Sequence, residues 1–327
     1  MALLEVRDLR TSFFTPAGEV KAVNGVSFNL DSGKVLGIVG ESGSGKSVTA
    51  YSILQILTHP GRIVGGSIKF KGQELVGLPD SEMRKIRGNR ISIIFQDPMT
   101  SLNPVYTVGN QLVEAIKLHT GRNGAQARDR AAELLSLVGI NEPEKRLKQY
   151  PYELSGGMRQ RVMIAMALAC EPDILIADEP TTALDVTIQA QILELMKELQ
   201  KELGMAILFI THDLGTVAKM CDKVAVMYLG RIVEYGDVRD IYKNPQHPYT
   251  RGLMGSVHKI GTRKLDRLFS IEGTVPLALN LKPGCGFYDR CLERQAGVCD
   301  QQEPDLTDMG GGHCAACYRC RKGGESA

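Results

Sequence analysis

The chain has 327 residues and a net charge of +2, with both signs interspersed. Its length suggests one large domain of roughly 250 residues followed by a smaller region. The sequence lacks any run of five or more like charges, which argues against nucleic acid or anionic lipid as a partner. We expect no signal peptide, and the longest apolar stretch, residues 162–170, is far shorter than the ~20 residues of a membrane span. The chain is therefore not expected to enter a bilayer by itself.

The first predicted strand, residues 35–39, leads directly into a glycine-rich loop and then a helical stretch. The loop reads Gly40-Glu41-Ser42-Gly43-Ser44-Gly45-Lys46-Ser47. Its backbone N–H groups can surround phosphate oxygens because no Cβ blocks their approach. In such a loop Lys46 holds the β- and γ-phosphates and the Ser47 hydroxyl binds Mg²⁺. A chance glycine-rich turn is the alternative, but the flanking strand and helix favour the phosphate loop.

A strand-like run at residues 91–95 precedes Gln96, and a region without strand-like runs follows. From about residue 98 to 168, helical patterns such as residues 125–138 alternate with Gly, Asn and Pro, which indicates a helical subdomain. Near its end, Ser155-Gly156-Gly157 opens a predicted helix. A helix N-terminus favours an anion. The phosphates of the same monomer are already held by the phosphate loop, so we expect two copies to share each ATP. A plain helix cap is the alternative.

Two further apolar runs, residues 174–177 and 206–210, flank an amphipathic helix at residues 188–203, which predicts an α/β core with parallel strands. Asp178-Glu179 follows the first run. We expect Asp178 to bind Mg²⁺ and Glu179 to orient and deprotonate the water that attacks the γ-phosphate. Gln96 and His212 also follow strand-like runs, where parallel sheets place ligands. Taken singly, either could instead be a satisfied polar residue at a strand end.

This order of motifs, from Phe13 to His212, resembles the ATP-binding-cassette family. The resemblance implies an α/β P-loop NTPase domain with a helical subdomain. It also implies roles for five sites: Phe13, with Phe14 as the alternative, stacks on adenine; Gln96 contacts magnesium and water; His212 holds the γ-phosphate; Ser155, Gly156 and Gly157 face the γ-phosphate bound by the opposite subunit; and Asp185, in the turn at residues 183–185, couples the two sites.

Residues 244–250 read Asn-Pro-Gln-His-Pro-Tyr-Thr and resemble the sequence that follows the cassette in oligopeptide and dipeptide importer ATPases. Physically the run is only a turn with a capping residue. We therefore expect an ATP-binding domain at residues 1–255 and a C-terminal extension at residues 256–327.

The resemblance implies an ATPase that energises peptide import from the cytoplasmic face of the cell membrane. Its implied partners are two integral membrane permeases, a second homologous ATPase subunit and an extracytoplasmic peptide-binding protein. Nickel chelates, glutathione or oligosaccharides are alternative cargoes. A soluble cassette ATPase acting on ribosomes or DNA is a further alternative, which the single cassette and the low net charge disfavour.

Six of the eight cysteines lie between residues 285 and 320. Because we expect no signal peptide, local metal chemistry is favoured over disulfides. The wide first spacings disfavour zinc, but zinc, an iron–sulfur cluster, and free thiols or disulfides all remain open. The family pattern implies a 4Fe-4S cluster on Cys285, Cys291, Cys299 and Cys317, with Cys314 and Cys320 as extra candidates; Asp289 departs from the proline of that pattern. Cys170 and Cys221 are interpreted as small core residues.

Overall fold

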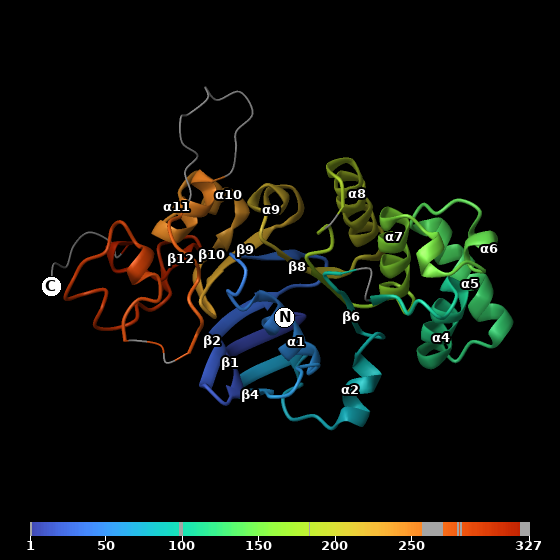
Figure 1. Ribbon diagram of the computed structural model, residues 1–327, viewed down its shortest axis with the longest axis horizontal. Coiled ribbons are helices and arrows are strands. Elements are labelled where there is room, and N and C mark those ends of the chain that lie inside the picture. Colours follow the sequence, from blue (N-terminus) through green and yellow to red (C-terminus); the bar gives the residue numbers. More distant parts are fainter. Residues whose placement is uncertain are drawn as a thin grey trace. The chain divides into compact units, whose positions relative to one another are not determined.

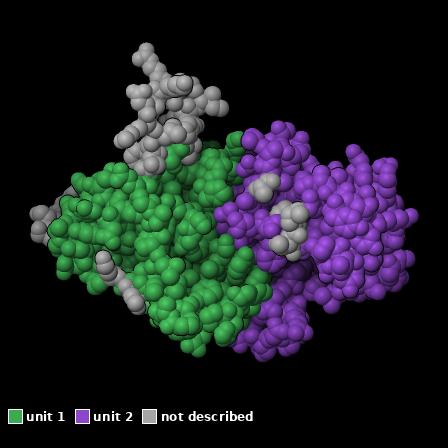
Figure 2. Space-filling model, viewed as in Figure 1, with its two compact units in different colours: residues 1–30, 35–76, 211–327 green, residues 31–34, 77–210 purple. Residues whose placement is uncertain are grey.

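The computed structural model describes residues 2–97, 101–182, 184–256, 271–279, 281 and 283–320. The chain divides into two compact units (Figure 2): unit 1 comprises residues 1–30, 35–76 and 211–327, and unit 2 comprises residues 31–34 and 77–210. In the described part of the chain, none of the helices combines the length and apolar character that crossing a bilayer requires.

Unit 1 begins with an antiparallel sheet in the order β2-β1-β4-β5 (Figure 1). Its strands are β1 (Leu4–Thr15), β2 (Gly18–Leu30), β4 (Gly61–Phe70) and β5 (Gln73–Glu74). Only one face of this sheet is strongly apolar: Leu4, Val6, Phe28 and Ile68 are buried, while neighbouring residues along the same strands are exposed. Polar and apolar residues are therefore mixed along each of these strands, and for this reason the sequence pattern predicts none of them.

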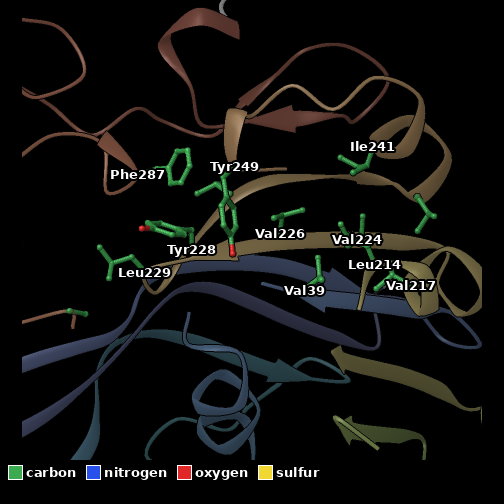
Figure 3. Close-up of a cluster of buried hydrophobic side chains, with 13 residues drawn as sticks. Val39, Leu214, Val217, Val224, Val226, Tyr228, Leu229, Ile241, Tyr249 and Phe287 are labelled. Atoms are coloured by element: carbon green, nitrogen blue, oxygen red, sulfur yellow. The ribbon is translucent and has the colours of Figure 1, made fainter. Parts of the chain in front are cut away.

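A second set of strands in unit 1 carries the predicted phosphate loop. Strand β3 (Val35–Val39) pairs in parallel with β9 (Lys223–Tyr228), and β9 pairs antiparallel with β10 (Arg231–Asp237). The helices of this unit are α1 (Lys46–Leu54), α9 (Leu214–Met220), α10 (Val238–Lys243) and α11 (Pro248–Gly255). Figure 3 shows a buried cluster, from Val39 and Val217 to Tyr249 and Phe287, that joins β3, β9 and β10 to α9, α10 and α11. Cys221, expected in the core, is half-buried and packs against this cluster; Cys170 is half-buried in unit 2.

Unit 2 contains three parallel strands that run in the order β6-β7-β8. They are β6 (Ile91–Ile94), β7 (Ile174–Asp178) and β8 (Ala206–Thr211), which agrees with the strands predicted from continuous apolar runs. Its helices are α2 (Asp80–Ile86), α4 (Val108–Thr120), α5 (Gly124–Leu137), α6 (Pro143–Arg146), α7 (Gly156–Ala167) and α8 (Val186–Leu203), with a 3-10 turn η1 (Pro151–Glu153). Helices α4 to α7 gather together (Figure 1) and fall where the sequence predicts a helical subdomain.

The C-terminal segment, defined here as the described residues from 271 to 320, covers sheet edges of unit 1. The Lys21 N–H on β2 donates to the Ala278 carbonyl at 3.0 Å, and β12 (Cys314–Ala315) pairs with β10 and with β11 (Thr307–Asp308). Two 3-10 turns, η2 (Tyr288–Arg290) and η3 (Tyr318–Cys320), complete it. Pairing of this kind protects exposed strand edges. The boundary near residue 255 stays a prediction, since residues 257–270 and 321–327 lie outside the described residues.

Candidate functional site

The phosphate loop, residues 40–47, connects β3 to α1 and requires glycine by its own packing. A Cβ on Gly40 would lie 2.2 Å from the Met227 carbonyl oxygen, and one on Gly45 would lie 2.3 Å from the Ala22 carbonyl oxygen. Gly45 also has a φ of 100°, a region in which side chains are strained. By contrast, a Cβ on Gly43 would meet no atom within 4 Å. One side of the loop is thus packed against neighbouring strands and the other is open.

Two polar side chains of the loop fit a bound phosphate. Lys46 is 5% exposed, and its Nζ donates to the carbonyls of Gly40 at 2.8 Å and Glu41 at 2.9 Å. Ser44 is completely buried, and its Oγ has no hydrogen-bond partner among the described residues. A buried polar group left without a partner costs about 1–3 kcal/mol. A phosphate oxygen would supply the missing partner, so the loop's residues suit the predicted nucleotide.

In unit 2 the structure brings Gln96 and Glu179 into direct contact. Asp178 ends β7 and is completely buried. Glu179 follows with a φ of 46°, and its N–H donates to the Ile210 carbonyl at 2.9 Å. Its Oε2 accepts from Gln96 Nε2 at 2.9 Å and from Thr182 Oγ1 at 3.0 Å. The carboxylate is therefore aimed by its backbone and by two side chains, which is the placement that a general base needs.

The Ser155-Gly156-Gly157 turn and Asp185 both begin helices of unit 2. Ser155 is exposed, and its Oγ accepts the Met158 N–H at 3.3 Å as the N-cap of α7. Asp185 is exposed too, and its Oδ1 accepts the Ile188 N–H at 3.0 Å as the N-cap of α8. Both residues therefore act as helix caps. Contact with a second subunit's phosphate stays a prediction, and Ala183 of the predicted turn lies outside the described residues.

The other predicted site residues lie in unit 1. His212 is exposed just after β8, beside the N-cap Asp213 of α9. Phe13 is half-buried, and its ring lies against Gly61, since a Cβ there would come within 2.6 Å of it. Phe14 is 38% exposed with the Arg62 guanidinium 4.0 Å from its ring centre. The choice between the two rings stays open. The predicted site residues thus fall into two groups, one in each unit.

Sequence reasoning missed two residues that hold the phosphate loop. The Glu41 N–H donates to Tyr249 Oη at 2.9 Å. Arg290 Nη1 and Nη2 donate to the two carboxylate oxygens of Glu41 at 2.7 and 3.0 Å. Tyr249 belongs to the His-Pro-Tyr-Thr run, whose only local signal is a turn. Arg290 is 249 positions away from Glu41, so no local pattern could have paired them.

The His-Pro-Tyr-Thr run fixes Tyr249 through a buried network. The sequence predicts only a turn with a capping residue here; in the structure His247 is the N-cap of α11, and its Nδ1 accepts the Tyr249 N–H at 3.1 Å. Glu234 is completely buried and accepts the N–H groups of Gln246 at 2.7 Å and His247 at 2.9 Å. His313 Nε2 pairs with the same carboxylate at 2.7 Å. This buried carboxylate therefore ties β10, α11 and the C-terminal segment together.

Cys285, Cys291, Cys299 and Cys317 line one cavity of the C-terminal segment, together with His247 and Phe287. Burial raises the pKa of the Cys285 thiol to about 11, and the negative charges of the other three cysteines add to the effect. A hydrogen bond from Cys320 lowers the pKa of Cys317 to about 6. None of the eight cysteines, all of them among the described residues, forms a disulfide.

These thiols do not have the arrangement of a single-ion site. Within the described ranges, no group of three or more His, Cys, Asp or Glu side chains is arranged to hold a metal ion. A zinc site gathers four donors about one point, so the zinc alternative has no support. The absence of such a group among the described residues also leaves the iron–sulfur prediction without support from a ready-made ligand set. What the structure provides is a shared cavity that collects the four predicted thiols, with Cys314 and Cys320 outside its lining.

Comparison with known proteins agrees with the arrangement of these motifs. Residues 23–182 match the family model described as ABC transporter, and residues 233–299 match the model described as oligopeptide/dipeptide transporter, C-terminal region. A probable peptide ABC transporter ATP-binding protein of Sinorhizobium fredii is 54% identical over 318 residues, which cover 97% of this chain and 95% of the relative. The dipeptide transport ATP-binding protein DppD of Bacillus subtilis is 53% identical over 317 residues, covering 97% and 94%.

The similarity extends to a second named cargo and to solved structures. The oligopeptide transport ATP-binding protein OppD of Salmonella typhimurium is 51% identical over 317 residues, covering 97% of this chain and 93% of the relative. A dimeric ATP-binding cassette in a post-hydrolysis state, bound to ADP and Pi, has a TM-score of 0.65 at 28% identity and covers 72% of this chain and 99% of that chain. The prediction of an α/β cassette fold is therefore confirmed. The chain belongs to the ATP-binding proteins of ABC transporters, in the group that carries the oligopeptide/dipeptide transporter C-terminal region.

Proposed function

We propose that this chain is the ATP-hydrolysing subunit of a peptide importer. For hydrolysis, the observation that carries the proposal is the Glu179 carboxylate, held by Gln96 and Thr182 at the end of a buried parallel strand. For the cargo, the support is the match of residues 233–299 to the oligopeptide/dipeptide transporter region and the peptide-transport names of relatives about half identical along nearly the whole chain.

In this proposal the phosphate loop binds the ATP phosphates, and Lys46 neutralises the β- and γ-phosphates. Magnesium would be held by Ser47, Gln96 and Asp178, and when bound it would neutralise charge on the phosphate oxygens. Glu179 accepts the proton of the attacking water, and His212 holds the γ-phosphate. Phe13 stacks on the adenine.

A second copy or a homologous subunit completes each site. Ser155, Gly156 and Gly157 would face the γ-phosphate bound by the opposite subunit, and Asp185 would couple the two sites. The exposure of Ser155 and Asp185, both at helix N-termini, supports this role. ATP would hold the dimer closed and hydrolysis would release it, which is how a local phosphate contact can drive a large movement.

The remaining partners follow from the transport role. We place the chain at the cytoplasmic face of the cell membrane with two integral membrane permeases, a second ATPase subunit and an extracytoplasmic peptide-binding protein. None of the described helices can span a bilayer. In this proposal the spanning segments of the complex belong to the permeases.

We also propose that Cys285, Cys291, Cys299 and Cys317 hold a 4Fe-4S cluster. The support is that the four thiols line one cavity. In such a cluster each cysteine binds a different iron, so the sulfurs need not converge on one point as they do around zinc. When bound, a cluster would add covalent links between residues 285–299 and Cys317 of the C-terminal segment.

Transport by the assembled complex tests the proposal. The full chain is co-expressed with permeases, the second ATPase subunit and the binding protein, and uptake of labelled dipeptides, longer peptides, glutathione, nickel chelate and oligosaccharide is measured in membrane vesicles. Peptide uptake that requires ATP and is lost in Glu179→Gln supports the function. ATP-dependent uptake of one of the other cargoes alone would replace the peptide assignment, and absence of ATP hydrolysis would remove the enzymatic one.

A further inference from the structure

Glu41, in the phosphate loop, is bonded to described residues of unit 1 through both its side chain and its backbone. Its carbonyl accepts from Lys46 Nζ at 2.9 Å, its N–H donates to Tyr249 Oη at 2.9 Å, and its carboxylate makes two parallel bonds with Arg290. A paired guanidinium–carboxylate contact fixes direction as well as distance. The position of Glu41 is therefore set by two residues outside the loop.

Arg290 is itself held in place and is not free to follow the loop. Its Nε donates to the Glu272 carbonyl at 2.9 Å and its Nη2 to the Gly273 carbonyl at 3.1 Å. Its side chain is only 7% exposed, and its guanidinium carbon lies 5.8 Å from the ring centre of Tyr228. With its donors shared between Glu41 and these carbonyls, the guanidinium has a single well-defined position.

Tyr249 is equally constrained. It is completely buried, its ring centre lies 4.7 Å from that of Tyr228 and 5.3 Å from that of Phe287, and its N–H is bonded to His247. Figure 3 shows Tyr249 among these rings, with its hydroxyl directed away from Phe287 and toward the strand that carries Val39. Val39 immediately precedes the phosphate loop. The hydroxyl that accepts the Glu41 N–H therefore belongs to a ring packed in a rigid aromatic cluster beside the start of the loop.

We propose that Arg290 and Tyr249 are positioning residues that hold the phosphate loop in its nucleotide-binding conformation through Glu41, so that α11 and the C-terminal segment together set the affinity for ATP. The inference rests on the proposed role of residues 40–47 in binding the phosphates. A loop that is ordered before the ligand arrives spares the ligand the cost of ordering it. When only a fraction of molecules has the competent loop, the apparent dissociation constant rises by the inverse of that fraction.

The test measures Mg-ATP affinity by calorimetry, and KM and kcat by phosphate release, on the full-length chain assembled with its transporter partners. Arg290→Gln, Tyr249→Phe and Glu41→Gln are each expected to raise the Kd and KM for ATP, by about tenfold for Arg290→Gln if about one loop in ten stays competent. The kcat changes little, because none of these groups acts in the chemical step. Arg290→Lys recovers only part of the affinity, since an ammonium cannot make the paired contact.

The matched control is Arg231→Gln. It also breaks an ion pair of the C-terminal segment, but this pair joins the segment to β10 and not to the phosphate loop. Arg231 contacts Glu303 at 2.7 Å, the same distance as the shorter Arg290–Glu41 contact, and neither Arg231 nor Glu303 belongs to the phosphate loop. Its KM is expected to match wild type. A merely structural role for Arg290 would instead lower the active fraction and kcat and raise KM no more than the control does.

A double-mutant cycle decides whether Arg290 acts through Glu41. Adding Arg290→Gln to Glu41→Gln is expected to change the Kd no further. Unchanged or tighter ATP binding in the single variants, or full additivity in the cycle, overturns the inference. If Arg290→Gln does not fold, Glu41→Gln and Tyr249→Phe give the same decision. Lys46→Ala separates the two proposals. If Lys46→Ala binds ATP as tightly as wild type, residues 40–47 do not have the proposed nucleotide-binding role. If Lys46→Ala loses ATP affinity and Arg290→Gln keeps it, only the inference about Arg290 is overturned.

Discussion

Glu179 adopts a backbone conformation that costs free energy, and the strain coincides with the proposed chemistry. Its φ of 46° lies in the left-handed region, which for residues other than glycine costs of order 1–3 kcal/mol and is concentrated at functional sites. The bond from its N–H to Ile210 and the two bonds to its Oε2 hold it there. Gln96 and Thr182 fix the direction of the side chain by donating to its Oε2.

Glu179→Gln is predicted to retain ATP binding and to lose hydrolysis by about 10²-fold or more, because an amide keeps the shape and cannot accept the proton of water. Phosphate release and calorimetric ATP binding on the same preparation measure the two effects. The matched control is Glu171→Gln: Glu171 also has a left-handed φ, 51°, but its carboxylate pairs with Arg130 at 2.9 Å. Near-normal turnover in Glu179→Gln, or an equal loss in Glu171→Gln, would contradict the base assignment.

Individual residues differ in how far sequence could predict them. Lys46, Ser47, Asp178 and Glu179 belong to contiguous motifs, because strand, turn and helix place neighbouring residues together. The contact between Gln96 and Glu179 joins positions 83 residues apart, although both could be placed at strand ends. Arg290 shows the limit: its contact with Glu41 depends on how the C-terminal segment runs along unit 1, which no local pattern encodes.

At the scale of elements, burial decided which strands the sequence could reveal. Strands β3, β7 and β8 are buried along their length and read as continuous apolar runs. Strands β1 and β2 face solvent on one side, and register shifts interrupt their alternation at several points. The observed helices α5 and α8 lie within one or two residues of the helical stretches predicted at residues 125–138 and 188–203, and the structure adds caps at Asn123 and Asp185.

Helix α11 is predicted to make the protein sensitive to acid. Burial lowers the pKa of His247 to about 3, and the charge of Arg251 adds to the effect. The unfolded chain binds a proton at this histidine as pH falls below about 6.5, but the folded chain does not until about pH 3. This contribution to stability is complete above pH 6.5 and is lost progressively as pH falls toward 3.

The variant His247→Asn isolates that contribution, because asparagine can cap the helix and does not titrate. Thermal unfolding of wild type and variant is compared at pH 7.5 and pH 5.0. Wild type is expected to lose about 2 kcal/mol more than the variant across this interval. The same pH dependence in both proteins would show that another group is responsible.

The C-terminal segment should lose its metal when one proposed ligand is removed. Protein purified without oxygen is expected to be brown and to contain iron, and Cys291→Ser is expected to lose the colour and most of the iron. Cys314→Ser is the control, because Cys314 lies outside the cavity lining. Iron and zinc are measured by elemental analysis. A colourless wild-type protein with stoichiometric zinc, or with neither metal, would rule out the cluster.

At the scale of the whole molecule, the proposed mechanism needs two subunits for each ATP. A variant in the Ser155-Gly156-Gly157 turn can separate ATP binding from closure of the dimer. A Cβ on Gly157 would come within 2.9 Å of Ile188, so this position is fixed by packing with α8. A Cβ on Gly156 would meet only Leu184, at an ordinary 3.9 Å. Gly156→Asp therefore fits the fold and places a negative charge at the N-terminus of α7, where the mechanism needs a phosphate from the other subunit.

The prediction concerns the chain with its second ATPase subunit in saturating Mg-ATP, observed by light scattering. With Glu179→Gln, slow hydrolysis should let a closed dimer accumulate, whereas Glu179→Gln combined with Gly156→Asp should bind ATP and stay monomeric, because two like charges would meet at the interface. Calorimetry confirms that the double variant still binds ATP. A dimer that forms equally well with Asp at position 156, or that never forms in Glu179→Gln, would mean that the phosphate does not bridge the subunits. If Glu179→Gln forms the dimer and only the double variant stays monomeric, dimer closure depends on the charge at the N-terminus of α7. Hydrolysis, which removes the bridging phosphate, would then reverse this closure.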